Sequence, residues 1–175
     1  MTPPSNLRSP LTDHSGHNKS WRPPPRGSLK INVDAHLSSD DHWFSGLILR
    51  REDGSAVGAA TRSHEGTDDA ILGESLGLND VLDWLERDNI SEVVIEMDNQ
   101  IVVNAVKRKA SIRKDWGAVV NRCVSFLIAN PNSTIAWINR KSNRVAHELA
   151  IWTEQEPNSF WPNSFPSCIS NHILK

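Results

Sequence analysis

Alternating apolar and polar residues mark the start of the ordered part of the chain. Residues 29–34 alternate with a period of two, which is typical of a β-strand. Residues 43–51 and 56–63 have the composition of two further strands, and Asp53 and Gly54 lie between them. Because a short Asp-Gly turn between two apolar runs favours a hairpin, the pattern predicts an antiparallel meander of three strands.

The hydrophobic spacing changes after this meander. From Ile71 to Leu85, apolar residues recur at steps of three and four, as on one face of a helix. Residues 93–97 form a short apolar run typical of a buried strand, and residues 134–138 form a further strand. Additional helices are expected at residues 101–106, 116–129 and 144–152.

This order of elements predicts the class of fold. A strand–helix–strand unit implies that its two strands pair in parallel. We therefore expect an α/β domain over residues 27–155, with a five-stranded mixed sheet and helices on both faces. Residues 1–26 are rich in proline and polar residues, which predicts a disordered or extended lead. Residues 156–175, which contain several prolines, are expected to form an irregular tail.

Composition adds few limits on function. The chain has 175 residues, of which 38% are hydrophobic and 23% charged, as is ordinary for a globular domain. Its formal net charge is −2, so a nucleic-acid partner can be argued only from local patches. Cys123 and Cys168 lack metal-type spacing, which favours a reducing compartment. Without a membrane-length apolar stretch or a secretory signal, we expect a monomeric nuclear or cytoplasmic protein.

Three carboxylates stand out against these elements. Asp34 and Asp98 each follow an apolar strand, at the sheet edge where ligands bind in sheets with parallel strands. Glu74 shares a helix face with Ile71 and Leu78, and this face should pack on the sheet. Such acids would repel one another unless they held a proton or a cation. Hard oxygen ligands select Mg²⁺ or Mn²⁺.

Each acid also has an ordinary structural interpretation. An aspartate after a strand is usually a turn residue or a helix cap, and a glutamate on a half-apolar face usually lies at its solvated border. The triplet in this order of elements is more specific than any one of its members. The metal site therefore depends on whether the fold brings the three acids together.

The residues also carry a family resemblance. From Trp21 to about Ile169, the chain resembles the ribonuclease H-like domains common in plants, which are related to the ribonuclease H part of non-LTR retrotransposons. The matching segments are Trp21 with Pro23, Pro24 and Pro25; Leu29 to Asp34; Gly46 to Arg50 with Asp53 and Gly54; Gly73, Glu74 and Ser75; Glu96 to Asn99; and Arg140, Asn143 and Val145 to Ala150.

This resemblance implies a ribonuclease H fold and hydrolysis of phosphodiester bonds assisted by two metal ions. Asp34, Glu74 and Asp98 match the metal-binding acids of the family, with Mg²⁺ or Mn²⁺ as the expected ion. The implied substrate is the RNA strand of an RNA–DNA hybrid, which the 2′-OH distinguishes from DNA.

The sequence departs from the family in three places along the chain. His147 stands in place of the fourth catalytic acid, and imidazole is a poor ligand for Mg²⁺. It is either a further catalytic residue or a helix residue that only packs. Ala35 and His36 replace the usual glycine and small residue after Asp34, and we expect them to narrow the substrate groove. Gly73 precedes Glu74 and should weaken its helix by about 1 kcal/mol relative to alanine.

A basic run supplies the candidate nucleic-acid contacts. Such a cluster would bind phosphates with a steep dependence on salt, although a solvated helix end explains it as well. Trp116 could stack on a base but is more typical of a core residue, and Trp43, Trp84, Trp137 and Trp152 are interpreted as packing. The candidate contacts are Lys107, Arg108, Lys109, Arg113 and Lys114, together with Asn143; Arg140, Lys141 and Arg144 are weaker candidates.

Three functions remain open from the sequence. The first is a metal-dependent endonuclease on RNA–DNA hybrids, favoured by the retained acids. The second is a nucleic-acid-binding module derived from such an enzyme that cuts weakly or not at all, favoured by His147 and by the Ala35-His36 pair. The third is a remnant of a retroelement whose site is not used.

Overall fold

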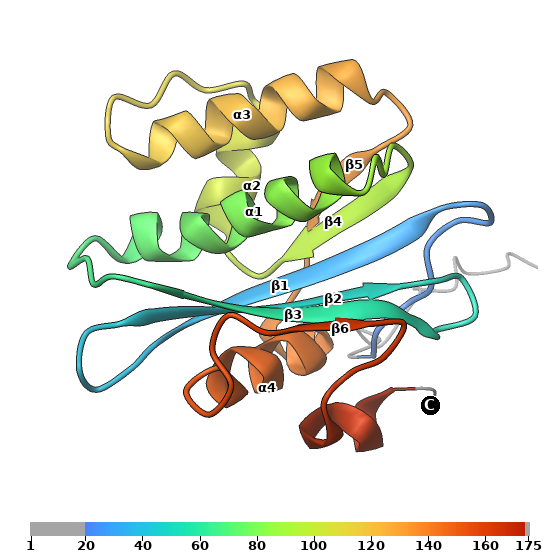
Figure 1. Cartoon of the computed structure of the whole chain (residues 1–175). Coiled ribbons are helices and arrows are strands. Elements are labelled where there is room, and N and C mark those ends of the chain that lie inside the picture. Colours follow the sequence, from blue (N-terminus) through green and yellow to red (C-terminus); the bar gives the residue numbers. More distant parts are fainter. Residues whose placement is uncertain (1–19, 174–175) are drawn as a thin grey trace, which may run out of the picture.

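The computed structural model describes residues 20–173, and within them a mixed sheet is covered by helices. Figure 1 shows these elements along the chain. They are β1 (Leu29–Leu37), β2 (Trp43–Arg50), β3 (Ala56–His64), α1 (Ala70–Arg87), β4 (Val93–Met97), α2 (Gln100–Lys107), α3 (Trp116–Ala129), β5 (Thr134–Trp137), the 3₁₀ helix η1 (Arg140–Asn143), α4 (Arg144–Trp152), β6 (Phe160–Pro162) and the 3₁₀ helix η2 (Ser167–His172).

The sheet has the predicted mixture of strand directions. Its order is β5-β4-β1-β2-β3-β6, with β1, β2 and β3 paired as an antiparallel meander. Strand β4 pairs in parallel with both β1 and β5, as expected for strands joined through helices. The predicted α/β fold with a mixed sheet is therefore confirmed, although the described residues contain six strands rather than five.

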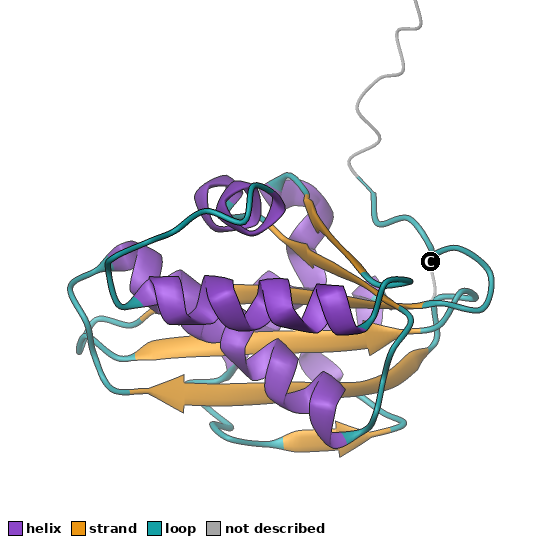
Figure 2. Ribbon diagram, turned by 90° about the horizontal axis from the view of Figure 1, so that it is seen from above, coloured by secondary structure: helices purple, strands orange, loops and turns teal. Residues whose placement is uncertain are grey.

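Helices cover both faces of this sheet. Helices α1, α2 and α3 lie on one side and α4 on the other (Figure 1), and the view from above shows helices lying over the strands (Figure 2). The larger hydrophobic core fills the space between the sheet and the first three helices, and a smaller one lies between β2, β3, α4 and η2. Within the described residues, no helix is long and apolar enough to cross a membrane.

Helix α1 packs unusually close to the sheet. Its first turn is capped by Asp69, whose side chain accepts hydrogen bonds from two backbone amides of the helix. A Cβ atom added at Gly73 would lie 2.1 Å from Cε2 of Trp43, and one added at Gly77 would lie 3.0 Å from Cγ2 of Val33. The two glycines therefore allow the helix to approach β1 and β2, which explains why a residue of low helix propensity stands before Glu74.

The chain after residue 155 is more regular than the sequence predicts. An irregular tail is expected over residues 156–175, but β6 pairs antiparallel with β3 and η2 packs against α4. The backbone N–H of Asn163 donates to the carbonyl of Val57, and Ile169 is fully buried. This segment completes the smaller core and covers the edge of β3, which would otherwise expose unpaired backbone groups.

The lead before β1 is described only from residue 20, so most of the expected disordered or extended segment lies outside the described residues. Residues 21–25 have no regular secondary structure. Trp21 nevertheless packs on the sheet: its Nε1 donates to Oδ1 of Asn32 at 3.1 Å, and its ring lies 4.0 Å from the guanidinium carbon of Arg50.

We predict that Gly73→Ala lowers the free energy of unfolding by about 1–3 kcal/mol, because the added methyl overlaps the Trp43 ring. That ring cannot easily move, since its Nε1 donates to the carbonyl of Thr67 at 3.0 Å. The clash should outweigh the gain in helix propensity of about 1 kcal/mol. Urea denaturation measures the change, with Asn121→Ala on the exposed face of α3 as the control. A Gly73→Ala protein more stable than the parent would contradict this packing.

Candidate metal centre

The register of the sheet brings the two aspartates together. In the parallel pairing of β1 with β4, Val33 lies opposite Met97, so Asp34 and Asp98 follow at neighbouring positions. Strands paired in this way lie about 4.8 Å apart. Asp34 is 5% exposed and Asp98 is half-buried. The sheet therefore holds two carboxylates side by side with little water around them.

Helix α1 supplies the third carboxylate, and its close packing through Gly73 brings Glu74 to the same place. Among the described residues, Asp34, Glu74 and Asp98 each offer an oxygen within 4.8 Å of the others' oxygens. The sequence prediction that these three acids meet at one site agrees with this geometry. Carboxylate oxygens at such spacing form a donor set that suits Mg²⁺ or Mn²⁺.

The three acids cannot all remain charged without a cation. Burial raises the pKa of Glu74 to about 8, and the charges of Asp34 and Asp98 add to this effect. Burial also raises the pKa of Asp98 to about 6, together with the charge of Asp34 and a hydrogen bond to it. At neutral pH the cluster alone therefore retains a proton, which a bound divalent ion would displace.

His147 contacts the cluster through one of its acids. Its Nδ1 lies 2.7 Å from Oδ2 of Asp34, and its side chain is 35% exposed. This contact depends on Gly46, which lies opposite Asp34 in the sheet, because a Cβ there would lie 2.3 Å from the backbone N of Ala150 on α4. Helix α4 can thus approach β2 closely enough for His147 to reach the acid. The neighbouring Glu148 is not a member of the acid cluster. Burial raises the pKa of the Cys168 thiol, and the charge of Glu148 adds to this effect.

Asn143 is predicted from sequence to contact nucleic acid, but it is only 1% exposed and has no surface for such a contact. Its Nδ2 donates to the carbonyl of Val33 at 2.8 Å, and its Oδ1 accepts from Nδ2 of Asn32 at 3.1 Å. The same Nδ2 of Asn32 lies 3.1 Å from Oε1 of Glu96. Asn143 therefore fixes the backbone of β1 just before Asp34 and acts as a positioning residue.

The predicted basic contacts lie apart from the acids. All five are exposed and lie at the end of α2 or in the loop that joins it to α3 (Figure 1). Helix α2 begins two residues after Asp98 and has eight residues, so its far end is about 12 Å away along the helix axis. The residues are Lys107, Arg108, Lys109, Arg113 and Lys114. Trp116, just after them, is 6% exposed and belongs to the core.

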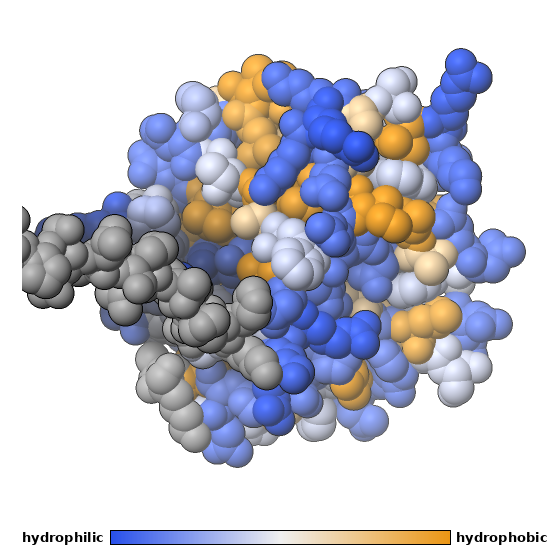
Figure 3. Space-filling model, turned by 180° about the vertical axis from the view of Figure 1, so that it is seen from behind, coloured by the Kyte–Doolittle hydropathy of each residue, from blue (hydrophilic) through white to orange (hydrophobic). Residues whose placement is uncertain are grey.

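Trp137 and Arg140 lie next to the acids, although the sequence gives little indication of this. Trp137 is interpreted as packing, but it is 45% exposed and its Nε1 donates to the backbone carbonyl of Asp98 at 3.1 Å. Nε of Arg140 lies 3.6 Å from Oδ2 of Asp98, and its charge opposes the rise in the pKa of that carboxyl. Figure 3 shows the molecule from behind, the side on which β5 and α2 lie, and there hydrophobic surface alternates with hydrophilic side chains. Only the three-dimensional pairing of β5 with β4 places these residues beside the acid.

Ala35 and His36, which the sequence predicts to narrow the substrate groove after Asp34, make other contacts in the structure. His36 turns away from the acids, since its Nε2 lies 3.1 Å from Oε1 of Glu154, beyond the end of α4. Ala35 lies opposite Ser45 in the meander. His36 therefore ties the end of β1 to the segment after α4, whereas Ala35 takes part in the pairing of β1 with β2.

The fold and the three acids define a ribonuclease H-like domain. Residues 32–153 match the reverse transcriptase-like family, and the chain belongs to that family. The matched segment includes all three acids and His147. A comparison with functionally curated proteins finds no match to this chain.

Solved structures with the same fold include three ribonuclease H proteins of low sequence identity. RNase H1 of the archaeon Halobacterium salinarum is 17% identical with a TM-score of 0.65, over 74% of this chain and 99% of that one. LC11-RNase H1 in complex with an RNA/DNA hybrid is 17% identical with a TM-score of 0.60, over 70% and 93%. The N-terminal RNase H domain of a Mycobacterium tuberculosis protein is 16% identical with a TM-score of 0.57, over 74% and 99%.

The raised pKa values predict how stability depends on pH when divalent ions are chelated. Because folded Glu74 binds its proton up to a pKa of about 8, against 4.5 ordinarily, the folded protein holds more protons than the unfolded chain between these values. The free energy of unfolding should therefore fall as pH rises from 4.5 to 8, by on the order of 5 kcal/mol from Glu74.

Urea denaturation at a series of pH values in a chelator measures this effect. Glu74→Gln, which cannot ionise, should flatten the profile and be the more stable protein at pH 8. Adding Mg²⁺ or Mn²⁺ should restore stability to the parent chain at pH 8 and leave Glu74→Gln nearly unchanged. A parent whose stability rises steadily from pH 4.5 to 8 in chelator would contradict the proximity of the acids.

Proposed function

We propose that this protein is a divalent-metal-dependent endonuclease that hydrolyses the RNA strand of RNA–DNA hybrids. The observation that carries the proposal is the convergence of Asp34, Glu74 and Asp98, which come from separate elements of a ribonuclease H-like fold. Buried carboxylates are costly without a partner, and no basic side chain is close enough to pair with all three within the described residues. A cation is the partner that satisfies them together.

The donor set fits the ions that the family uses. Asp34 lies centrally, because it contacts Asp98 in the sheet and His147 on α4. Glu74 and Asp98 each lie on one side of the cluster and are half-buried, so their oxygens remain accessible from solvent. Mg²⁺ or Mn²⁺ ions held there, two in the proposed mechanism, would activate water and stabilise the leaving oxygen.

The chain's own residues prepare the site for this chemistry. Asn143 fixes the β1 backbone at Val33, and this sets the direction of the Asp34 carboxylate. Trp137 holds the backbone carbonyl of Asp98 and thereby limits movement at the end of β4. Arg140 is largely exposed beside Asp98, where its positive charge can meet a phosphate of the scissile strand.

A nucleic-acid substrate is supported by the structural relatives. LC11-RNase H1, which has the same fold, is a solved complex with an RNA/DNA hybrid. In this chain the exposed basic residues between α2 and α3 would hold phosphates of the duplex outside the metal centre. We propose that they bind the duplex while the acids act on one strand.

Asp98→Asn should reduce cleavage of a labelled RNA–DNA hybrid at least ~100-fold in Mg²⁺ and in Mn²⁺, because it removes a metal-binding oxygen and half of the aspartate pair. The measurement is the single-turnover rate with protein in excess. Asp83→Asn on the exposed face of α1 is the matched control and should cleave like the parent. Equal rates for parent and Asp98→Asn would refute the proposal.

A second function, binding without cleavage, is favoured by one observation. His147 takes the place of the fourth acid, and its contact with Asp34 occupies an oxygen that would otherwise face a metal ion. An imidazole there supplies a softer ligand than a carboxylate, so the second ion would be held weakly. Salt-sensitive binding of the hybrid by a parent protein that does not cut would identify this function.

His147→Asp should raise the affinity for Mg²⁺ by about tenfold and increase cleavage in Mg²⁺, because it adds a hard oxygen ligand beside Asp34. Isothermal titration with Mg²⁺ measures the affinity, and the hybrid assay measures the rate. His64→Asp, on β3 beside Asp80, is a control at another histidine–aspartate contact and should leave Mg²⁺ affinity at the acids unchanged. Weaker Mg²⁺ binding in His147→Asp would mean that the histidine itself is required as a ligand.

A further inference from the structure

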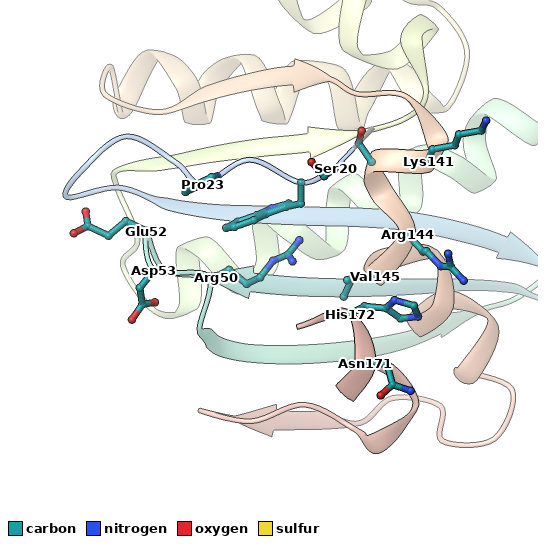
Figure 4. Close-up of a pocket in the computed structure, with 13 residues that line it drawn as sticks. Ser20, Pro23, Arg50, Glu52, Asp53, Lys141, Arg144, Val145, Asn171 and His172 are labelled. Carbon is teal, nitrogen blue, oxygen red and sulfur yellow. The ribbon is translucent and has the colours of Figure 1, made fainter. Parts of the chain in front are cut away.

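A second site lies beside the N-terminal end of α4, outside the cluster of acids. A pocket of about 560 Å³ opens there between the lead to β1, the end of β2, η1 and η2. Figure 4 shows Lys141, Arg144 and His172 on one side of the pocket, together with the Arg50 side chain. The guanidinium carbon of Arg50 lies 4.0 Å from the centre of the Trp21 ring. These side chains bring several positive groups to one cavity.

Arg50 is the most unusual of them, because it is 3% exposed and incompletely bonded. Its Nη2 donates to Oδ1 of Asn32 at 3.3 Å, but its buried Nε has no hydrogen-bond partner among the described residues. The Trp21 ring covers the guanidinium on one face. A buried donor without an acceptor costs free energy, and a ligand oxygen entering the pocket would supply that acceptor.

The buried charges around Arg50 do not balance. Lys30 pairs with Glu96 at 3.1 Å, and both side chains are nearly inaccessible. Arg50 shares the same glutamate, so these three buried residues carry two positive charges and one negative charge. Burial lowers the pKa of Arg50 to about 10, which leaves it charged at neutral pH. The excess positive charge faces the pocket rather than a second carboxylate.

An exposed cation at the pocket rim stands where a helix disfavours it. Arg144 is the first residue of α4, and the first turn of this helix, which is fully described, contains no acidic residue. Positive charge near a helix N-terminus is electrostatically unfavourable, whereas an anion there is stabilised. Positive charge at this position is therefore unfavourable in the free protein and becomes favourable when an anion is bound.

The two acids that line the same pocket are engaged elsewhere. Oε2 of Glu52 accepts from the backbone N–H of Gly27 at 2.8 Å. Oδ1 of Asp53 accepts from the backbone N–H and the hydroxyl of Ser55. Figure 4 shows both acids on the side of the pocket away from Lys141 and Arg144. They therefore close one end of the pocket without neutralising the other.

We propose that this pocket binds a phosphate group of the nucleic-acid backbone, with Lys141 and Arg144 as the exposed contacts and Arg50 as the buried donor. This inference rests on the proposed function. Arg50 pairs with Lys30, four residues before Asp34 along β1, so the pocket lies about 13 Å from the acids. Since about 3.4 Å is the rise per nucleotide along the duplex axis, and successive phosphates of a strand lie further apart than this rise, the bound phosphate is at most about four nucleotides from the one that is cut.

The test uses the full chain with both Lys141→Gln and Arg144→Gln, which are exposed positions that preserve the buried network. Affinity for a labelled hybrid is measured by anisotropy over a series of salt concentrations, in the Asp98→Asn background so that the hybrid stays intact. We expect about tenfold weaker binding and a slope of log K against log salt that is smaller by about 1–2. Arg62→Gln on β3, also exposed but outside the pocket, is the control and should change neither value.

A scan of single neutral methylphosphonates along each strand locates the contact. We expect one methylphosphonate position, within about four nucleotides of the cut, to weaken binding by the parent and not by the double variant. An unchanged affinity, slope and scan in the double variant would overturn the proposal. A second outcome would also overturn it: millimolar inorganic phosphate stabilises the parent but not the double variant, while both bind the hybrid equally well. The pocket would then bind a small free anion rather than the nucleic-acid backbone. The affinity and the salt slope are binding measurements, so they succeed or fail independently of whether the protein cleaves.

Discussion

The mutual repulsion of three half-buried or buried carboxylates is the interaction on which the rest of this structure depends. Asp34, Glu74 and Asp98 are brought within reach of one another by the parallel pairing of β1 with β4 and by the close packing of Gly73 on α1 against Trp43. Folding therefore uses hydrophobic burial to hold together groups that would otherwise separate. The raised pKa values of Glu74 and Asp98 indicate that the cost is substantial, and a cation is the natural way to offset it.

The two faces of the sheet contribute to this site in different ways. The face under α1, α2 and α3 is apolar and fixes the distance of Glu74 from the strands. On the other face, the alternate residues of β1 form a buried polar network that extends from Lys30 through Asn32 to Asn143. Such a network has few arrangements that satisfy all its donors, so it fixes the direction of β1 more narrowly than apolar packing would.

Much of this could be predicted from local patterns. The strand period of two and the helical spacing depend on neighbours in sequence, and they gave the meander, α1 and the position of each acid. Strand β6 has only three residues and contains Pro162, so its pairing depends on the exposed edge of β3. The stacking of Trp21 on Arg50 and the burial of Asn143 likewise depend on contacts between distant segments, which no local period encodes.

The distribution of charge matters more than its sum in a chain with a net charge of −2. A cluster of acids repels the phosphates that it is proposed to cut, so nucleic acid can approach only when that charge is neutralised. Arg140 beside Asp98 does this in part, and bound divalent ions would complete it. Metal and nucleic acid then favour each other's binding, and by linkage each must raise the affinity for the other by the same factor. Basic groups placed away from the acids, at the α2–α3 loop and at the start of α4, would attract the proposed duplex without competing with the ions for the carboxylates.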